Sequence, residues 1–150
     1  MPEDFASRLM RWKFNIFPAY RGTGGRVKYI AADFREVRVA LPLSFRTRNA
    51  VGTIFGGSMY AAVDPVYMIM LMRNLGRGYV VWDKAATIRF RRPGRTTLFA
   101  TFRLDQEEID AIRAATASGE PLNRTYNVDL VDADGVPHAT VEKIIYIKRI

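Results

Sequence analysis

One acidic residue stands inside the most apolar stretch of this 150-residue sequence. Asp64 lies within the segment from Gly56 to Leu75, which otherwise carries few polar side chains. A carboxylate among apolar groups is costly unless it is paired or hydrogen-bonded. Ionisable groups in such surroundings mark functional sites more often than chance would. Asp64 is therefore the first candidate for chemistry, as a general base or as a nucleophile.

The same segment opens with two glycines, Gly56 and Gly57. The first N–H groups of a helix have no partner within the helix and lie at the positive end of its dipole. Such N–H groups can bind a carbonyl oxygen as it gains negative charge, which is what acyl transfer requires. Glycines at this place also permit close packing of the helix start, and the sequence leaves both interpretations open.

Asp64 has structural interpretations as well. It could pair with an arginine such as Arg73 or Arg89. Because Pro65 follows it, and proline within a helix removes a hydrogen bond and kinks the helix, Asp64 could instead be the N-cap of a second helical segment.

The elements around this segment indicate an α+β fold. A helix that is apolar nearly all round belongs in a core, and the strands on either side are joined by turns too short for parallel crossovers. One antiparallel sheet curled around one central helix fits this order, within a single domain over 1–150. The expected elements are helices over Phe5–Phe17, Gly56–Leu75 and Asp105–Ala117, and strands over Arg26–Leu41 (broken near Ala31–Phe34), Tyr79–Phe90, Thr96–Leu104, Arg124–Val131 and His138–Ile147.

The spacing around the glycines resembles a known family. Asn49, the string Gly52-Thr-Ile-Phe-Gly-Gly57 and Asp64 are similar to the motif of hot-dog-fold acyl-CoA thioesterases of the phenylacetyl-CoA thioesterase type. A wider string resembles a bacterial branch of that superfamily whose function is unassigned; it comprises Asp64-Pro-Val-Tyr67, Val81-Trp-Asp-Lys84 and Arg91-Arg-Pro-Gly-Arg95. The resemblance implies a hot-dog fold with a long central helix, with extra helices at the N-terminus and between strands. It also implies a homodimer or a dimer of dimers.

Roles follow from the resemblance residue by residue. Gly57 would donate its N–H to the thioester carbonyl, Asp64 would be base or nucleophile, and Asn49 would position water or the thioester. Gly56 and Phe55 would lie against the substrate. From the neighbouring subunit, Asp83 or Lys84 would complete a shared site. Phe55 stands where the family usually has histidine, and a phenyl ring cannot hydrogen-bond as imidazole does. A non-catalytic protein that binds an acyl group or acyl-CoA is therefore the alternative to hydrolysis.

The charge balance narrows the ligand class. The formal net charge is +8, and a basic protein attracts polyanions such as nucleic acid or the phosphates of coenzyme A. No nucleic-acid motif is recognisable, so nucleic acid is not expected. Arg91, Arg92 and Arg95 could hold phosphates through their guanidinium forks, or could simply be a solvated strand edge. No cofactor is expected, since coenzyme A would enter as part of the substrate.

Other features exclude several classes of site. The chain has no cysteine and a single histidine, His138, so a thiol nucleophile is excluded and a metal centre is not expected. No stretch is long enough to cross a membrane and no signal peptide is recognised, so a cytoplasmic protein is expected. The segment Phe5–Phe17 could touch a membrane or could cover the acyl tunnel or a sheet edge.

Overall fold

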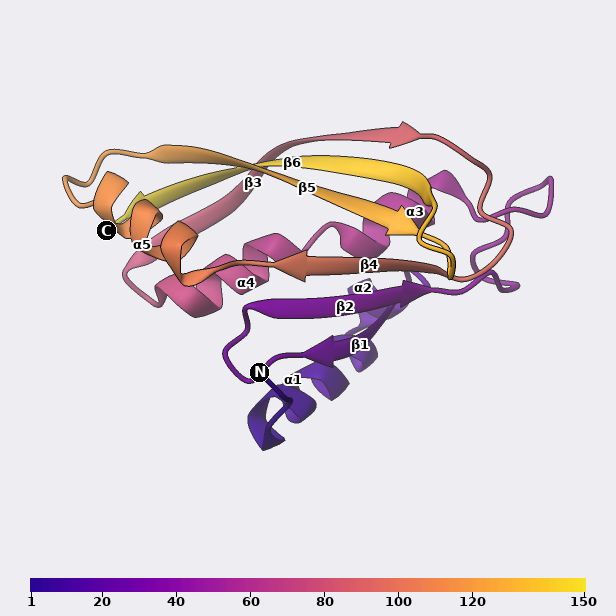
Figure 1. Cartoon of the computed structure of the whole chain (residues 1–150), viewed down its shortest axis with the longest axis horizontal. Coiled ribbons are helices and arrows are strands. Elements are labelled where there is room, and N and C mark those ends of the chain that lie inside the picture. The colour runs from indigo at the N-terminus through magenta and orange to yellow at the C-terminus, as the bar shows by residue number, and fades with distance from the viewer.

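A computed structural model describes all residues from 1 to 150. One six-stranded sheet and five helices make up the chain (Figure 1). The elements in order are α1 (Phe5–Ile16), α2 (Pro18–Arg21), β1 (Arg26–Ile30), β2 (Glu36–Leu41), α3 (Gly56–Val63), α4 (Val66–Leu75), β3 (Tyr79–Phe90), β4 (Leu98–Arg103), α5 (Gln106–Ala115), β5 (Leu122–Val131) and β6 (Pro137–Arg149). The expected break between the first two strands and the α+β class are confirmed.

The sheet is antiparallel throughout, in the order β1-β2-β4-β5-β6-β3. It curves around the helical pair α3 and α4, which lies along one face (Figure 1). Side chains of a strand point alternately to its two faces. On β6 the inward positions Val141, Lys143, Ile145 and Ile147 are each at most 1 % exposed. Three of the four are apolar and belong to the core, and Lys143 is the exception.

The central helix is interrupted in its middle. Asp64 closes α3 in a helical conformation (φ −48°, ψ −57°), and α4 restarts at Val66 after Pro65. Proline lacks the N–H that would continue the helical hydrogen bonds. The long helix expected over Gly56–Leu75 is therefore two shorter helices, and Asp64 sits at the joint.

The N-terminal helix α1 covers the free edge of the sheet at β1. The Asn15 side chain donates to the Val27 carbonyl at 2.9 Å and accepts from the Val27 N–H at 2.8 Å. A Glu3 carboxylate oxygen accepts from the Ile30 N–H at 2.9 Å. These side chains satisfy backbone groups that an edge strand would otherwise leave open. Covering a sheet edge was one of the roles expected for this segment.

The opposite edge of the sheet is β3, a long strand that pairs only with β6. Its register slips by one residue between Asp83 and Ala85, which leaves Lys84 unpaired as a β-bulge. Nothing in the chain covers its outer side. No helix of the structure combines the length and the apolar character that crossing a bilayer requires.

Candidate functional site

Asp64 reaches from the helix joint to the sheet, where it meets a lysine. Its Oδ1 lies 2.5 Å from Lys143 Nζ and accepts a hydrogen bond of 2.7 Å from the Tyr60 hydroxyl. Tyr60 lies one turn earlier on α3, so the helix itself brings the two side chains to one face. The Asp64 side chain is still 42 % exposed. The carboxylate is thus held on one side and open on the other.

Lys143 is the buried cation of this cluster. It lies on β6, between Ala86 of β3 and Tyr126 of β5, and its side chain is 1 % exposed. Lysines are almost never so buried unless they are paired. Its Nζ contacts Asp64, the Tyr60 hydroxyl at 3.2 Å and Asp83 Oδ1 at 3.2 Å. These partners can satisfy all three donors of the ammonium group.

Asp83 joins the cluster because of its place on β3. It pairs with Ile145, an inward-facing residue of β6, so its side chain points to the same face as that of Lys143. The bulge at Lys84 follows directly. Lys84 borders a surface hollow that Trp82 and Asp83 also line, and it forms no ion pair with Asp64 or Asp83. Of the two residues expected to complete the site from β3, the structure brings Asp83 alone to Lys143, and does so within one chain.

The cluster holds one cation and two carboxylates. Burial raises the pKa of Asp83; Lys143 lowers it in part and the charge of Asp64 raises it further. Burial alone would lower the pKa of Lys143, but hydrogen bonds to Asp64 and Tyr60 and the charges of Asp64 and Asp83 place that pKa above its ordinary value. Burial and the hydrogen bond to Asp64 raise the pKa of the Tyr60 hydroxyl. Lys143 therefore stays charged, and Asp83 is the carboxyl that takes up a proton more readily than usual.

The other candidate group is the start of α3. Neither the Gly56 nor the Gly57 N–H donates a hydrogen bond within the chain. Two exposed rings approach these glycines: a Cβ on Gly56 would lie 2.9 Å from Phe90, and a Cβ on Gly57 would lie 2.5 Å from Phe55. Close packing of the helix start and free N–H groups therefore coexist here. The Phe55 ring, at the position where the related family usually has histidine, lies against Gly57.

Asn49 is engaged in its own loop. Its side-chain oxygen accepts from the N–H groups of Val51 and Thr53, and its amide nitrogen donates to the Thr53 hydroxyl. No hydrogen bond links it to Asp64. Its expected role in positioning water or the thioester stays a prediction.

Arg92 and Arg95 are exposed and form no ion pair in the chain. Arg92 borders an open surface hollow with Arg91 and Asp129. Both arginines lie in the turn after β3, so they extend from the same strand as Asp83. The phosphate role proposed from the sequence remains open to test.

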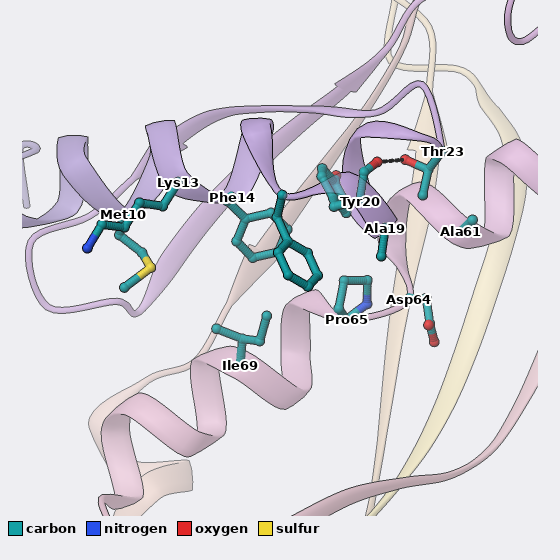
Figure 2. Close-up of a pocket in the computed structure, with 11 residues that line it drawn as sticks. Met10, Lys13, Phe14, Ala19, Tyr20, Thr23, Ala61, Asp64, Pro65 and Ile69 are labelled. Atoms are coloured by element: carbon teal, nitrogen blue, oxygen red, sulfur yellow. Dashed lines mark hydrogen bonds between the residues drawn. The ribbon is translucent and has the colours of Figure 1, made fainter.

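A separate apolar cavity of about 520 Å³ lies between α1, α2 and the joint of the central helix (Figure 2). Figure 2 shows the Asp64 carboxylate pointing away from Phe14 and Ile69 on the cavity wall. Asp64 itself lines this cavity, so its carboxylate lies at the border of the apolar space. The residues that line the cavity are Met10, Lys13, Phe14, Phe17, Ala19, Tyr20, Thr23, Ala61, Asp64, Pro65 and Ile69.

Two of the structural interpretations of Asp64 are wrong. Its partner is neither Arg73 nor Arg89 but Lys143, and its side chain makes no capping bond to α4. Sequence reasoning missed Lys143 and Tyr60. A signal was present for the lysine, because position 143 shares the inward parity of Val141, Ile145 and Ile147.

Comparison with solved structures shows the same fold over nearly the whole chain. The protein PA5026 of Pseudomonas aeruginosa, described as a probable thioesterase of unknown function, superposes with a TM-score of 0.84 at 20 % identity, covering 100 % of this chain and 99 % of its own. Thioesterase HI1161 of Haemophilus influenzae gives 0.71 at 12 % identity, with coverage of 98 % and 93 %. The E. coli PaaI protein from the phenylacetic acid degradation operon gives 0.62 at 16 % identity, with 95 % and 91 %.

These relatives are thioesterase-like hot-dog proteins, so the hot-dog fold expected from the sequence is confirmed. No protein with a curated function matches this sequence significantly. The sequence model of a domain of unknown function, DUF4442, matches residues 6–147. Because that match spans nearly the whole chain, the protein belongs to the DUF4442 family.

Proposed function

We propose that this protein hydrolyses an acyl-CoA or a related acyl thioester. The observation that carries the proposal is Asp64, a carboxylate held by Lys143 and Tyr60 with one side open, on the helix that begins with the free N–H of Gly57. Two structural neighbours are described as a thioesterase and a probable thioesterase, which supports the reaction class. The proposed reaction uses no bound cofactor, since coenzyme A enters as part of the substrate.

In the proposed reaction Asp64 accepts a proton from water, and the resulting hydroxide attacks the thioester carbonyl carbon. The carbonyl oxygen gains negative charge and is stabilised by a helix N–H such as that of Gly57. The C–S bond then breaks and the thiolate leaves as the coenzyme A thiol after taking up a proton. Asp83 could supply this proton, because its pKa is raised above the ordinary value.

The geometry of α3 favours a site shared by two subunits. Gly57 and Asp64 are seven residues apart on one helix, which is about 10 Å along its axis. The donor to the oxyanion must lie about 3 Å from the carbonyl oxygen, and the base must reach the attacking water directly. Within one chain the carbonyl and the attacking water would have to span nearly this whole distance. Gly57 of one copy facing Asp64 of another would bring the two groups closer to one carbonyl.

The open edge of β3 supports a dimer. Its backbone groups are unpaired along one side over 12 residues, and such an edge is ready to pair with another strand. Pairing of two β3 strands about a two-fold axis would extend the sheet and bring the two helical joints to one interface. Sedimentation velocity at micromolar concentration tests this, and it distinguishes a dimer from a dimer of dimers.

Thiol release from a panel of acyl-CoA esters tests hydrolysis. Activity should collapse in Asp64→Asn and persist in Asp134→Asn, which changes an exposed aspartate of the β5–β6 turn. Gly57→Pro removes an N–H in the first turn of α3, where the helix leaves that group without a partner; the exposed Phe55 ring must move aside for the new side chain, and the variant should also be inactive. Unchanged turnover in Asp64→Asn would refute the proposed role of this carboxylate.

Mixing the two inactive variants tests the shared site. In a heterodimer of Asp64→Asn and Gly57→Pro, one of the two sites retains both native groups if each site uses both subunits. Random exchange would then restore about a quarter of the wild-type activity. No restoration, with exchange verified by mass, would place the groups of each site in one chain.

Phe55 favours a second candidate, a protein that binds acyl-CoA without turning it over. Its exposed ring lies against Gly57 and offers no hydrogen bond to a substrate. This candidate predicts thermal stabilisation by acyl-CoA without thiol release. If the Phe55→His variant gains hydrolysis that the wild type lacks, the wild type is a binding protein, because the substitution restores the residue typical of the related enzymes.

A further inference from the structure

The helix α1 has two apolar faces, and only one of them is buried. Phe14 packs toward the body, whereas Phe5, Leu9, Trp12 and Ile16 point outward. At 3.6 residues per turn these four positions fall within about 60° around the helix axis. Phe5 is 83 % exposed and Trp12 is 59 % exposed. We call these four residues the α1 stripe; a contiguous exposed apolar surface of this kind marks an interaction site.

The α1 stripe cannot turn inward, because the opposite side of the helix is fixed. Asn15 is hydrogen-bonded to both backbone groups of Val27. The Phe14 ring packs edge-on against Tyr20 at 4.6 Å, and the Tyr20 hydroxyl donates to the Ala62 carbonyl at 2.8 Å. These contacts join α1 to β1 and to the central helix. The outward direction of the stripe is therefore a fixed property of the fold.

Positive charge surrounds the α1 stripe. Arg8 and Lys13 flank it, each about 40° beyond its margins on the helical projection. Neither forms an ion pair in the chain, whereas Arg11 is paired with Glu3 at 2.8 Å. Residues 1–30 contain six lysines and arginines and two acidic residues, so they supply +4 of the net charge of +8. Half of the excess charge thus lies in the first fifth of the chain.

We propose that α1 docks this protein on an anionic lipid membrane surface. A helix that has Trp, Phe and Leu on one face and basic residues beside them lies in the plane of such a surface, with the apolar face among the acyl chains and the basic groups on the lipid phosphates. The positive charge beside the stripe argues against a second copy of this chain as the partner. A two-fold contact would place Arg8 and Lys13 of one copy close to the same residues of the other. The α1 stripe favours lipid over nucleic acid, since an apolar stripe gains nothing from a phosphate backbone.

The apolar cavity lies under the same helix. Lys13 and Phe17 line it, and Phe17 is itself 61 % exposed beside the end of the stripe. Docking of α1 would therefore bring an opening of the cavity close to the lipid. The docking itself does not depend on thioester hydrolysis and is measured without any thioester.

Co-sedimentation of the full-length protein with vesicles tests the docking. Vesicles of equal parts phosphatidylcholine and phosphatidylglycerol should bind the protein, and phosphatidylcholine vesicles should bind it much more weakly. The pair Trp12→Ala and Ile16→Ala should weaken binding by at least about tenfold, because it removes the central apolar anchors. The pair Arg8→Gln and Lys13→Gln should also weaken binding and should reduce its salt dependence. These side chains are exposed, so circular dichroism should show unchanged folding.

Phe45→Ala is the matched control, because Phe45 is 89 % exposed but lies in the loop after β2; its vesicle binding should equal that of the wild type. A second readout uses Trp82→Phe, which leaves Trp12 as the only tryptophan, and its emission should shift to the blue on anionic vesicles. Absent binding, or binding that both double variants retain, would overturn the proposal. So would a smaller oligomer of the stripe variant without vesicles, since that would make the stripe a contact between copies.

Discussion

Removing both acidic partners of Lys143 should cost much more stability than the two single changes suggest. At an effective dielectric constant of about 20, the attraction between Lys143 and Asp83 at 3.2 Å is about 5 kcal/mol, and that with Asp64 at 2.5 Å is about 7 kcal/mol, before desolvation is subtracted. Desolvation of the buried ammonium offsets several kcal/mol of this. One carboxylate is therefore enough to keep the lysine paired.

The single variants should then be mild. The raised pKa of Asp83 shows that its burial offsets much of its attraction to Lys143. Asp83→Asn should therefore lower the free energy of unfolding by only about 1 kcal/mol. Asp64→Asn removes a half-exposed carboxylate, whose pairing is partly screened by water, and about 1–2 kcal/mol is expected. The double variant leaves Lys143 buried without a counter-charge. That situation costs about 3–5 kcal/mol, so the central expectation is that the two changes couple by about 1.5 kcal/mol.

Urea unfolding of the four proteins at pH 7 and equal protein concentration measures this cycle, with Asp134→Asn as a control for loss of an exposed carboxylate. The pH dependence of the stability of the double variant is an independent test. In the double variant burial would lower the folded pKa of Lys143 below its unfolded value, so stability should rise as pH increases toward about 10.4. If the losses of the two single variants add up in the double variant, and the double variant loses less than about 1 kcal/mol, Lys143 does not need a counter-charge.

Three further predictions concern single contacts. The pKa of Lys143 in the folded protein lies above its ordinary 10.5, so its contribution to stability is complete below pH 10.5 and is lost as pH rises through the folded pKa. Over that pH range the wild type should lose more stability than Lys143→Met, which urea unfolding at a series of pH values measures. Tyr20→Phe deletes the buried hydrogen bond to the Ala62 carbonyl and should lower the free energy of unfolding by about 1 kcal/mol, measured in the same assay. Asn15→Ala should cost about 1–2 kcal/mol and should speed hydrogen exchange at the Val27 amide, because both backbone groups of that residue lose their partner.

Much of the fold could be predicted because its strands alternate and its turns are short. The strand over Tyr79–Phe90 begins and ends where the sequence placed it, and the hairpin turn at Asp132–Gly135 is present between β5 and β6. The central helix was expected as one piece, and Pro65 divides it as its chemistry requires. Local patterns are sufficient for these elements because each depends on neighbours in the sequence.

The partners within the site could not be predicted in the same way. Lys143 is 79 residues from Asp64, and the register that joins them depends on the pairing of β6 with both β3 and β5. Sequence indicates that position 143 faces inward, but not what it faces. The same holds for His138, to which no role was assigned: its ring bonds to Asp132 and to the Pro93 carbonyl, each at 3.0 Å, and ties together two turns that are distant in sequence.

The unequal surroundings of the two carboxylates bear on how such a site could work. Lys143 can neutralise only one of the two carboxylates. The cluster of three side chains therefore retains one negative charge, and the two carboxylates compete for Lys143. The Asp83 side chain is 26 % exposed and its pKa is raised, whereas the Asp64 side chain is 42 % exposed. Paired titratable groups whose surroundings differ in this way take different roles in proton transfer. Asp64 then suits the role of base toward water on its open side, and Asp83 suits that of proton donor. Lys143 joins both, so a proton gained by one carboxylate strengthens the hold of the lysine on the other.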